Sequence, residues 1–444
     1  MGLDRASLSP RLLKKLVYAG SNATSFQQGS AFLGELADYA CKPRQVLRAC
    51  HRIGGERLQQ RQQVVASFEE LTLAQRDRPP CAPPDLIAIM ADGGSIQIRP
   101  GEEEERAAET GAAAGDPPGG TAGEPASKER CWREEKVGIL VRLAPTAHET
   151  DPCPDLPEVF RDPLVVLKLA REVGHADVPA ARKFEGPKAE EGGPDVAEAA
   201  EAADDPEPVP ADEGPSGKKA GRRPGAPQVL SRRVVATRQT VEAFGPLLAA
   251  MAWSMGFLAA PRGAFVGDGA AWLWGIQEKY FPRLVPVVDF IHVLSYVFAA
   301  ALAGRVDLEE GWPIYQEWIT WVWQGDVERL LAALRQRVQE LPEGSAARTT
   351  VAGSLGFLAG QKGRLSYAAY RQQGLPIMSS LIESTVKQIG RRVKGSEKFW
   401  TEEGAEAVLQ LRADYLSDDE PMTHFWKERA QGMTGQNPYR RKAS

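Results

Sequence analysis

Hydrophobic residues in the first 80 positions recur at the three- and four-residue spacing of a helix face. One such stripe runs over residues 26–40. Pro43, a favoured first residue of a helix, then begins a second stripe, which Gly54 and Gly55 are expected to end. The pattern predicts an N-terminal helical region in which two helices are joined by a short turn.

The second of these helices also carries a basic face. Three arginines follow one another at four-residue intervals and so share one side of the helix. A helix that packs inward beside another that offers arginines to a DNA groove is a helix-turn-helix-like arrangement. The alternative is a small bundle with a solvated basic face. The DNA contacts predicted for this region are Arg44, Arg48 and Arg52.

Strand patterns follow the helical region. A short apolar run ends at Asp92, and Gly93 and Gly94 are expected to form a tight turn before a second, alternating run. Three strands, a helix and two further strands predict one α/β unit. Its expected members are strands 86–91, 95–99, 136–142, 264–268 and 284–289 and a helix over 240–256.

Two acidic, low-complexity segments interrupt this unit, at residues 101–130 and 186–228. Both contain too few large apolar side chains to offset the entropy of ordering, so both are predicted to be mobile loops. The chain has a formal net charge of −5 and each segment contributes −5, which leaves +5 on the remainder. A mildly basic remainder is compatible with nucleic-acid binding.

From residue 290 onward the sequence becomes helical and rich in aromatic residues, which predicts an all-α insertion. Tryptophans in such a segment more often belong to a core than to a base-stacking platform. The predicted organisation is a helical domain over 1–80, the first part of the α/β core over 81–289, the helical insertion over 290–375, the completion of the core over 376–430 and a flexible basic tail over 431–444.

Cysteine and hydropathy patterns exclude several classes of protein. The five cysteines and five histidines show no C-x-x-C pair and no zinc-ligand spacing, so neither a disulfide framework nor a structural zinc site is predicted. No run of about 18 apolar residues is present, and the N-terminus lacks the apolar stretch of a signal peptide. We expect a cytoplasmic protein without a membrane span.

Two aspartates occupy similar settings. Asp92 and Asp268 each end a predicted strand and precede a glycine, in ADGG and GDGA. A carboxylate at the end of a buried strand is costly unless a cation, a donor or water satisfies it, and glycine leaves space beside it. Neighbouring strand ends can bring the two carboxylates together. The alternative is a turn aspartate at each position.

Glu383 begins a polar stripe on a predicted helix in MSSLIESTVKQIGRRVKGSEKFW. Basic residues follow it at helical spacing, which fits a metal-binding glutamate flanked by side chains that contact phosphates. The alternative is a solvated helix face on which Glu383 and Lys387 form an ion pair. The phosphate contacts predicted here are Lys387, Arg391, Arg392 and Lys394.

The segments ADGGSIQIR, GDGAAWLW with VVDFIH downstream, and LIESTVKQIGRRVKGSEKFWTEEGAEAVLQLRADYL resemble the three catalytic blocks of bacterial insertion-sequence DDE transposases. The resemblance implies a ribonuclease-H-like mixed sheet with helices. It also implies an aspartate on the first strand, another after the fourth, a glutamate on a late helix and a helical insertion before that helix. One departure is Met378-Ser379-Ser380, where such transposases often carry a Gly-Ser-Gly-like turn.

The resemblance further implies a chemistry. Asp92, Asp268 and Glu383 would bind two Mg²⁺ (or Mn²⁺) ions, about 3.5–4 Å apart, that serve cleavage at transposon ends and attack of the freed 3′-hydroxyl on target DNA. Asp289 and His292, spaced D-x-x-H, would support this site or contact the substrate. The implied partners are DNA and further copies of the chain assembled on it, which makes nucleoid association the expected location.

Two other functions fit the same residues. One is a metal-dependent nuclease with a ribonuclease-H-like core that lacks strand transfer. The other is a non-catalytic DNA-binding protein derived from a transposase.

Overall fold

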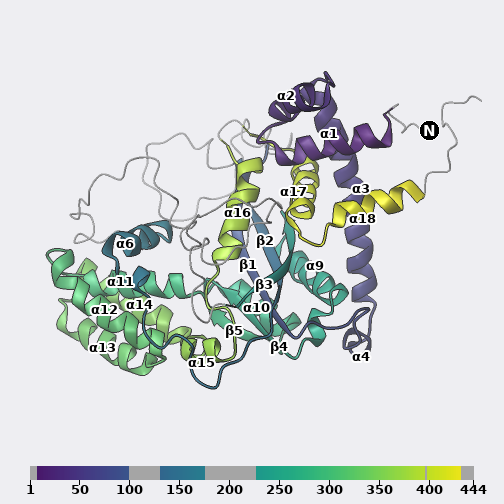
Figure 1. Cartoon of the computed structure of the whole chain (residues 1–444). Coiled ribbons are helices and arrows are strands. Elements are labelled where there is room, and N and C mark those ends of the chain that lie inside the picture. The colour runs from purple at the N-terminus through teal and green to yellow at the C-terminus, as the bar shows by residue number, and fades with distance from the viewer. Residues whose placement is uncertain (1–7, 100–130, 176–226, 396–397, 432–444) are drawn as a thin grey trace, which may run out of the picture.

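The computed structural model describes residues 8–99, 131–175, 227–395 and 398–431 (Figure 1). The first acidic segment lies outside these ranges, as does the second apart from its last two residues, so the mobility expected for them concerns residues outside the described structure. The same holds for residues 432–444 of the predicted basic tail.

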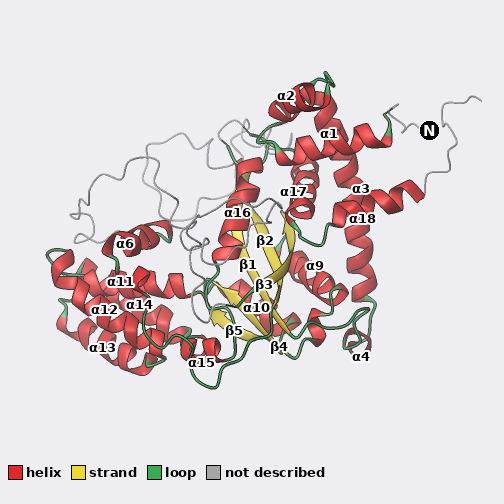
Figure 2. Ribbon diagram, viewed as in Figure 1, coloured by secondary structure: helices red, strands yellow, loops and turns green. Residues whose placement is uncertain are grey.

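A five-stranded mixed sheet forms the centre of the molecule, in the order β3-β2-β1-β4-β5 (Figure 2). Strand β1 (Leu86–Gln97) runs antiparallel to β2 (Trp132–Leu143), which runs antiparallel to β3 (Val229–Thr237). On its other side β1 is parallel to β4 (Arg262–Gly267), and β4 is parallel to β5 (Val285–Val288). The predicted α/β class is confirmed.

The number of strands was predicted correctly, but two of the predicted strands are one. Gly93 and Gly94 do not form a turn, because β1 continues through them and pairs with β2 as far as Gln97. A Cβ atom on Gly94 would lie 2.6 Å from Oε1 of Glu135 on β2. This glycine therefore makes room for a buried side chain on the neighbouring strand. Strand β3 was missed, because its polar residues Ser-Arg-Arg interrupt the apolar pattern.

The N-terminal region is helical, as its spacing predicts, but α3 is longer than expected. The helix runs over Pro43–Glu69 and continues through Gly54 and Gly55. A Cβ atom on Gly54 would lie 2.6 Å from both Cβ and the carbonyl oxygen of Ala407, so this glycine permits close contact with α17 instead of ending α3. The other helices here are α1 (Pro10–Asn22), α2 (Phe26–Ala37) and α4 (Leu73–Arg76).

A group of helices lies between β5 and the late helix α16, where an all-α insertion was predicted (Figure 1). Tyr315 is fully buried and Trp323 is 2% exposed, so these aromatic residues belong to the core, as expected. The helices of this group are α11 (Phe290–Leu302), α12 (Leu308–Gln324), α13 (Val327–Glu340), α14 (Ala346–Gly360) and α15 (Tyr367–Gln372).

Three of the remaining helices, α9, α16 and α17, pack directly against the sheet, whereas α6 packs against α11 of the insertion. Phe244 and Leu248 of α9 lie over Gly138 on one face of the sheet, whereas α16 contacts β1 and β2. Helix α17 packs against β3 and against α3. The remaining helices are α6 (Pro163–Glu172), α9 (Val241–Ser254), α10 (Ala271–Tyr280), α16 (Ser380–Val393), α17 (Glu402–Leu416) and α18 (Pro421–Gln431).

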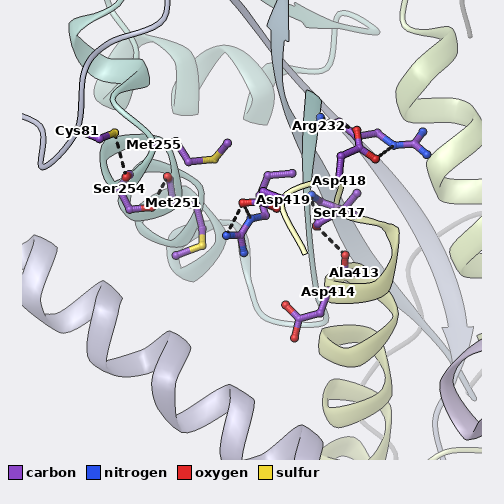
Figure 3. Close-up of polar contacts among 12 residues, drawn as sticks. Cys81, Arg232, Met251, Ser254, Met255, Ala413, Asp414, Ser417, Asp418 and Asp419 are labelled. Atoms are coloured by element: carbon purple, nitrogen blue, oxygen red, sulfur yellow. Dashed lines mark hydrogen bonds and ion pairs between the residues drawn. The ribbon is translucent and has the colours of Figure 1, made fainter. Parts of the chain in front are cut away.

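The chain that follows α17 covers the open edge of β3. The backbone N–H of Val234 donates to Oγ of Ser417 at 2.9 Å, and the backbone N–H of Asp418 donates to the carbonyl oxygen of Arg232 at 2.9 Å. The carboxylate of Asp418 in turn accepts the backbone N–H of Arg232 at 2.8 Å (Figure 3). These bonds satisfy groups that an edge strand otherwise presents to other chains.

Within the described ranges, no helix combines the length and the apolar character that crossing a membrane requires.

Candidate metal centre

Asp92 lies within β1, not at its end as the sequence suggested. It is half-buried, and its Oδ1 accepts the backbone N–H of Gly93 at 2.7 Å. The parallel pairing of β1 with β4 ends at Met90 and Val266. The same register, extended by two residues, brings Asp92 level with Asp268. Because adjacent strands lie about 4.8 Å apart, this register makes the two aspartates neighbours.

Asp268 follows the last residue of β4 and begins a turn. Its Oδ1 accepts the backbone N–H of Ala270 at 2.8 Å, and Gly269 adopts a φ of +106°, which favours glycine. Burial raises the pKa of Asp92, and the negative charge of Asp268 raises it further. The two carboxylates therefore act on each other electrostatically, as two like charges near one site do.

Asp289 connects three parts of the core. Its side chain is fully buried; Oδ2 accepts the backbone N–H and the Nδ1 of His292, at 3.0 and 2.8 Å. Its Oδ1 accepts the backbone N–H of Ser379 at 2.7 Å, and its own backbone N–H donates to the carbonyl of Gly267 at 2.8 Å. Asp289 therefore joins the end of β4, the start of α11 and the turn before α16.

Glu383 lies in the first turn of α16, where Oγ of Ser379 donates to its Oε1 at 3.2 Å. Burial and the charge of Asp289 raise the pKa of Glu383 to about 7, against the opposing effect of His292. The departure from a glycine-rich turn thus has a local consequence. Ser379 bonds to Asp289 through its backbone and to Glu383 through its side chain.

The metal ligands predicted from the sequence do not form one close group. Among the residues that the structure describes, the group of three His, Cys, Asp or Glu side chains whose ligand atoms all lie within 4.8 Å of one another is Asp289, His292 and Glu383. Asp92 and Asp268 lie beside each other on the neighbouring strands but outside that group. The D-x-x-H pair is therefore closer to Glu383 than the sequence suggested.

His292 links the two sets of carboxylates. Burial alone would lower the pKa of its imidazole, but the hydrogen bond to Asp289 and the charges of Asp289, Asp268 and Glu383 together raise that pKa to about 9. His292 also lowers the pKa of Asp92. The five side chains therefore form one electrostatic cluster beside Asp92 of β1 and the ends of β4 and β5, with a cation at neutral pH among four carboxyl groups.

The donor set suits a divalent metal ion. Carboxylate oxygens are the ligands that Mg²⁺ and Mn²⁺ prefer, and gathered carboxylates whose pKa is raised gain from a nearby cation. The Nδ1 of His292 is engaged by Asp289, as in many sites where a carboxylate orients a metal-binding histidine. The Nε2 of His292 would bind a metal ion only after losing the proton that the raised pKa favours.

The predicted DNA contacts fall into two sets. Arg44 and Arg48 on α3 and Lys387 and Arg391 on α16 are exposed, whereas Arg52 and Lys394 are half-buried.

Arg392 does not belong to either set. It is 3% exposed, its Nε donates to the carbonyl oxygen of Gly20 at 2.9 Å, and its guanidinium lies 4.3 Å from the ring centroid of Phe26. Adjacent helix residues point about 100° apart, so Arg392 turns inward where Arg391 turns outward. Arg392 is therefore not exposed on the helix surface as Lys387 and Arg391 are, and its predicted contact with phosphate stays a prediction.

Sequence reasoning also missed a buried acid beside this centre. Glu135 on β2 is fully buried, and neither carboxylate oxygen has a hydrogen-bond partner among the described residues. Burial raises its pKa to about 7, although the charge of Lys394 lowers it. It shares the sheet face of Asp92, because Glu135 is paired with Gly94 and Asp92 with Val137. The sequence did contain a sign of this, because Glu135 alternates along the strand with the buried Val137 and Ile139 and so shares their face of the sheet.

Comparison of the chain with models of known protein families and with curated proteins finds no match in either case.

Proposed function

We propose that the protein is a DDE transposase, which cuts DNA strands at transposon ends and joins the freed 3′-hydroxyl to target DNA with the help of divalent metal ions. The observation that carries the proposal is the convergence of acidic residues from three distant parts of the chain. Asp92 and Asp268 are level on adjacent strands, and Glu383 is joined to the end of β4 through Ser379 and Asp289.

The positions of these residues support the proposal. The resemblance implies an aspartate on the first strand, one after the fourth strand and a glutamate on a late helix that follows a helical insertion. Asp92 is on β1, Asp268 follows β4, and Glu383 is on α16 after helices α11 to α15. A ribonuclease-H-like core is the fold we propose for this sheet and its helices.

A bound divalent ion would supply the charge that activates a water or a 3′-hydroxyl and stabilises the departing oxygen. Asp92, Asp268 and Glu383 would hold such ions. Ser379 orients the carboxylate of Glu383 through its hydroxyl. His292, fixed through Nδ1 by Asp289, faces the carboxylates that surround it and limits their mutual repulsion.

The exposed basic residues of α16 would bind the DNA backbone near the scissile bond. Lys387 and Arg391 lie one and two turns beyond Glu383 on the same side of the helix. Phosphate contacts of this kind fix the position of DNA without reading its sequence. A strand that follows this side of α16 would therefore be held with one phosphate at the carboxylates.

The test uses the full chain, Mg²⁺ or Mn²⁺, and a DNA fragment that carries the sequences flanking the coding region. Asp268→Asn is expected to abolish cleavage while it retains DNA binding, whereas Asp85→Asn, at the exposed position just before β1, serves as the matched control. Cleavage followed by joining supports a transposase. Cleavage alone indicates a nuclease, and salt-sensitive binding without cleavage indicates a DNA-binding module. Undiminished cleavage by Asp268→Asn removes this residue from the mechanism.

A further inference from the structure

A pocket of about 350 Å³ lies where the N-terminal helices meet the end of α16. Its walls come from the starts of α2 and α3, the chain after β1, the last turn of α16 and residues 398–401. The volume is within the range of about 300–1,000 Å³ that small-molecule pockets span. We call this hollow the aromatic pocket, after the rings of Phe26, Phe399 and Trp400 that line it.

The aromatic walls are held by several bonds. The rings of Phe26 and Trp400 meet edge to face, with centroids 5.9 Å apart. The indole Nε1 of Trp400 donates to the carbonyl oxygen of Val393 at 2.9 Å, and its backbone N–H donates to the carbonyl oxygen of Gln97 at 3.0 Å. Phe399, in contrast, is 44% exposed at the rim. The pocket therefore has fixed rings inside and an accessible ring at its entrance.

Arg392 supplies a donor at the inner wall. Its guanidinium lies over Phe26 and is 5.1 Å from the centroid of Trp400. One of its terminal nitrogen atoms, Nη2, is buried and has no hydrogen-bond partner within the described parts of the chain, and the same is true of Nε2 of His51, another residue that lines the pocket. A buried donor without an acceptor is costly. A ligand that brings an acceptor into the pocket would remove that cost.

The chemistry of these walls selects a flat ligand with a carbonyl group. Aromatic rings bind the faces of nucleobases by stacking, and arginine N–H groups are the usual donors to base carbonyls. A phosphate would need several donors in place of rings. The cationic side chains of Arg99 and Lys398 line the pocket with the rings and would suit the backbone of the strand that carries the base.

The pocket lies at the opposite end of α16 from Glu383. Arg392 follows Glu383 by nine residues, which corresponds to about 13 Å along the helix axis and about half a turn around it. Arg392 therefore faces away from the side of α16 that bears Glu383, Lys387 and Arg391, and the pocket is separate from the metal centre.

We propose that the aromatic pocket binds one unpaired base of the DNA that carries a carbonyl group, such as guanine or thymine, extruded from the duplex. The inference rests on the proposed function for the identity of the polymer. Extrusion costs unstacking energy, which is least where the base is already unpaired. The pocket would thus select DNA whose end is frayed or distorted, a property that the carboxylates alone do not provide.

The test is equilibrium binding of the full chain in EDTA, so that no cleavage occurs. The probes are one fluorescent duplex in fully paired form and three versions with a single bulged guanine, thymine or adenine. We expect the guanine or thymine bulge to bind about tenfold more tightly than the paired duplex, and adenine to gain less because it has no carbonyl group. Phe399→Ala should reduce the preference to about threefold or less.

Phe32→Ala is the matched control, because Phe32 lies on α2 with 43% of its side chain exposed, close to the value for Phe399. A second variant, Leu47→Trp, fills the pocket without removing a polar contact and should also abolish the preference. Thermal unfolding of each variant verifies that it is folded. Equal affinity of the wild-type chain for bulged and paired duplexes would overturn the proposal that the pocket binds a base. A preference that survives both Phe399→Ala and Leu47→Trp would overturn it too. Neither result would affect the proposed DNA cleavage and joining. No affinity for any duplex overturns both proposals.

Discussion

The two ends of α16 bury charge of opposite sign and stabilise it in different ways. At the first end, Glu383 lies among carboxylates, and burial with the charge of Asp289 raises its pKa to about 7. At the other end, Arg392 lies between aromatic rings and donates to the carbonyl of Gly20. In Figure 1 the helix runs from the side of the helical insertion toward α1 and α2.

Basic residues that are close together in the sequence can lie in different environments in the folded chain. Arg391 is exposed and Arg392 is buried, although they are adjacent in one helix. An acidic end that lacks enough cationic partners is suited to metal ions. A basic end that already has rings around it is suited to a flat ligand. Each end can be tested separately.

The largest effect is expected at the acidic end. Glu383→Gln keeps the shape of the side chain but removes its charge, so metal-dependent cleavage should fall on the order of 10³-fold, or about 4 kcal/mol of transition-state stabilisation. Single-turnover cleavage with Mn²⁺ measures this. Glu35→Gln, an exposed glutamate on α2, is the control. Cleavage within about threefold of the wild-type rate would place the chemistry elsewhere.

The buried Glu135 beside the acidic end predicts a pH dependence of stability. Its pKa is about 7 in the folded chain against 4.5 for an unperturbed glutamate, so the folded state binds the proton more tightly. Stability from this group is complete below pH 4.5 and is lost as the pH rises through 7. Glu135→Gln should therefore gain stability over the wild type between those pH values, by about 3 kcal/mol at most. Urea unfolding at pH 5 and pH 8 measures the difference, and a difference independent of pH would contradict it.

The basic end predicts a loss of stability from one residue but not from its neighbour. Arg392→Gln removes the contacts with two rings and the bond to Gly20, so the free energy of unfolding should fall by about 2 kcal/mol. Arg391→Gln, at the exposed position, should change it by less than about 0.5 kcal/mol. Urea unfolding of the two variants measures the change in the free energy of unfolding for each. Equal losses would mean that burial does not distinguish the two arginines.

The smallest effect expected is on DNA affinity at the exposed side of α16. Arg391→Gln should weaken binding several-fold across unrelated duplexes and lower the slope of log affinity against log salt by about 1. Arg335→Gln, which changes a charge on α13, is the control. DNA affinity measured at several salt concentrations between about 50 and 200 mM gives the slope. An unchanged slope would remove Arg391 from the DNA contacts.

Local signals in the sequence were sufficient for the α/β class, the helical insertion and the positions of the acidic blocks. Asp268 next to glycine after an apolar run and Glu383 at the head of a helix are features of short segments, so they could be recognised without the rest of the chain. Asp92 was placed at the end of a strand because Gly93 and Gly94 resemble a turn. The reason for Gly94 is Glu135 on another strand, which the local pattern does not contain.

The parts that failed depend on contacts between distant segments. Gly54 was predicted to end a helix, whereas its role is to accept Ala407 of α17. Arg392 was grouped with its basic neighbours as a phosphate contact, but its inward orientation follows from contacts with α1 and α2. The closeness of Asp289 and His292 to Glu383 depends on the backbone of Ser379, which composition cannot reveal. The aromatic pocket joins five separate segments and had no signal in any of them.

The cover on β3 has a consequence for synthesis of the chain. The residues that close this edge, from Ser417 to Asp418, are translated only after β3, the helices of the insertion, α16 and α17. Until they emerge, the growing polypeptide presents a row of free amide and carbonyl groups to its neighbours on the polysome. A chain cut short before Ser417 should therefore associate through that strand, even if every residue of the metal centre is present.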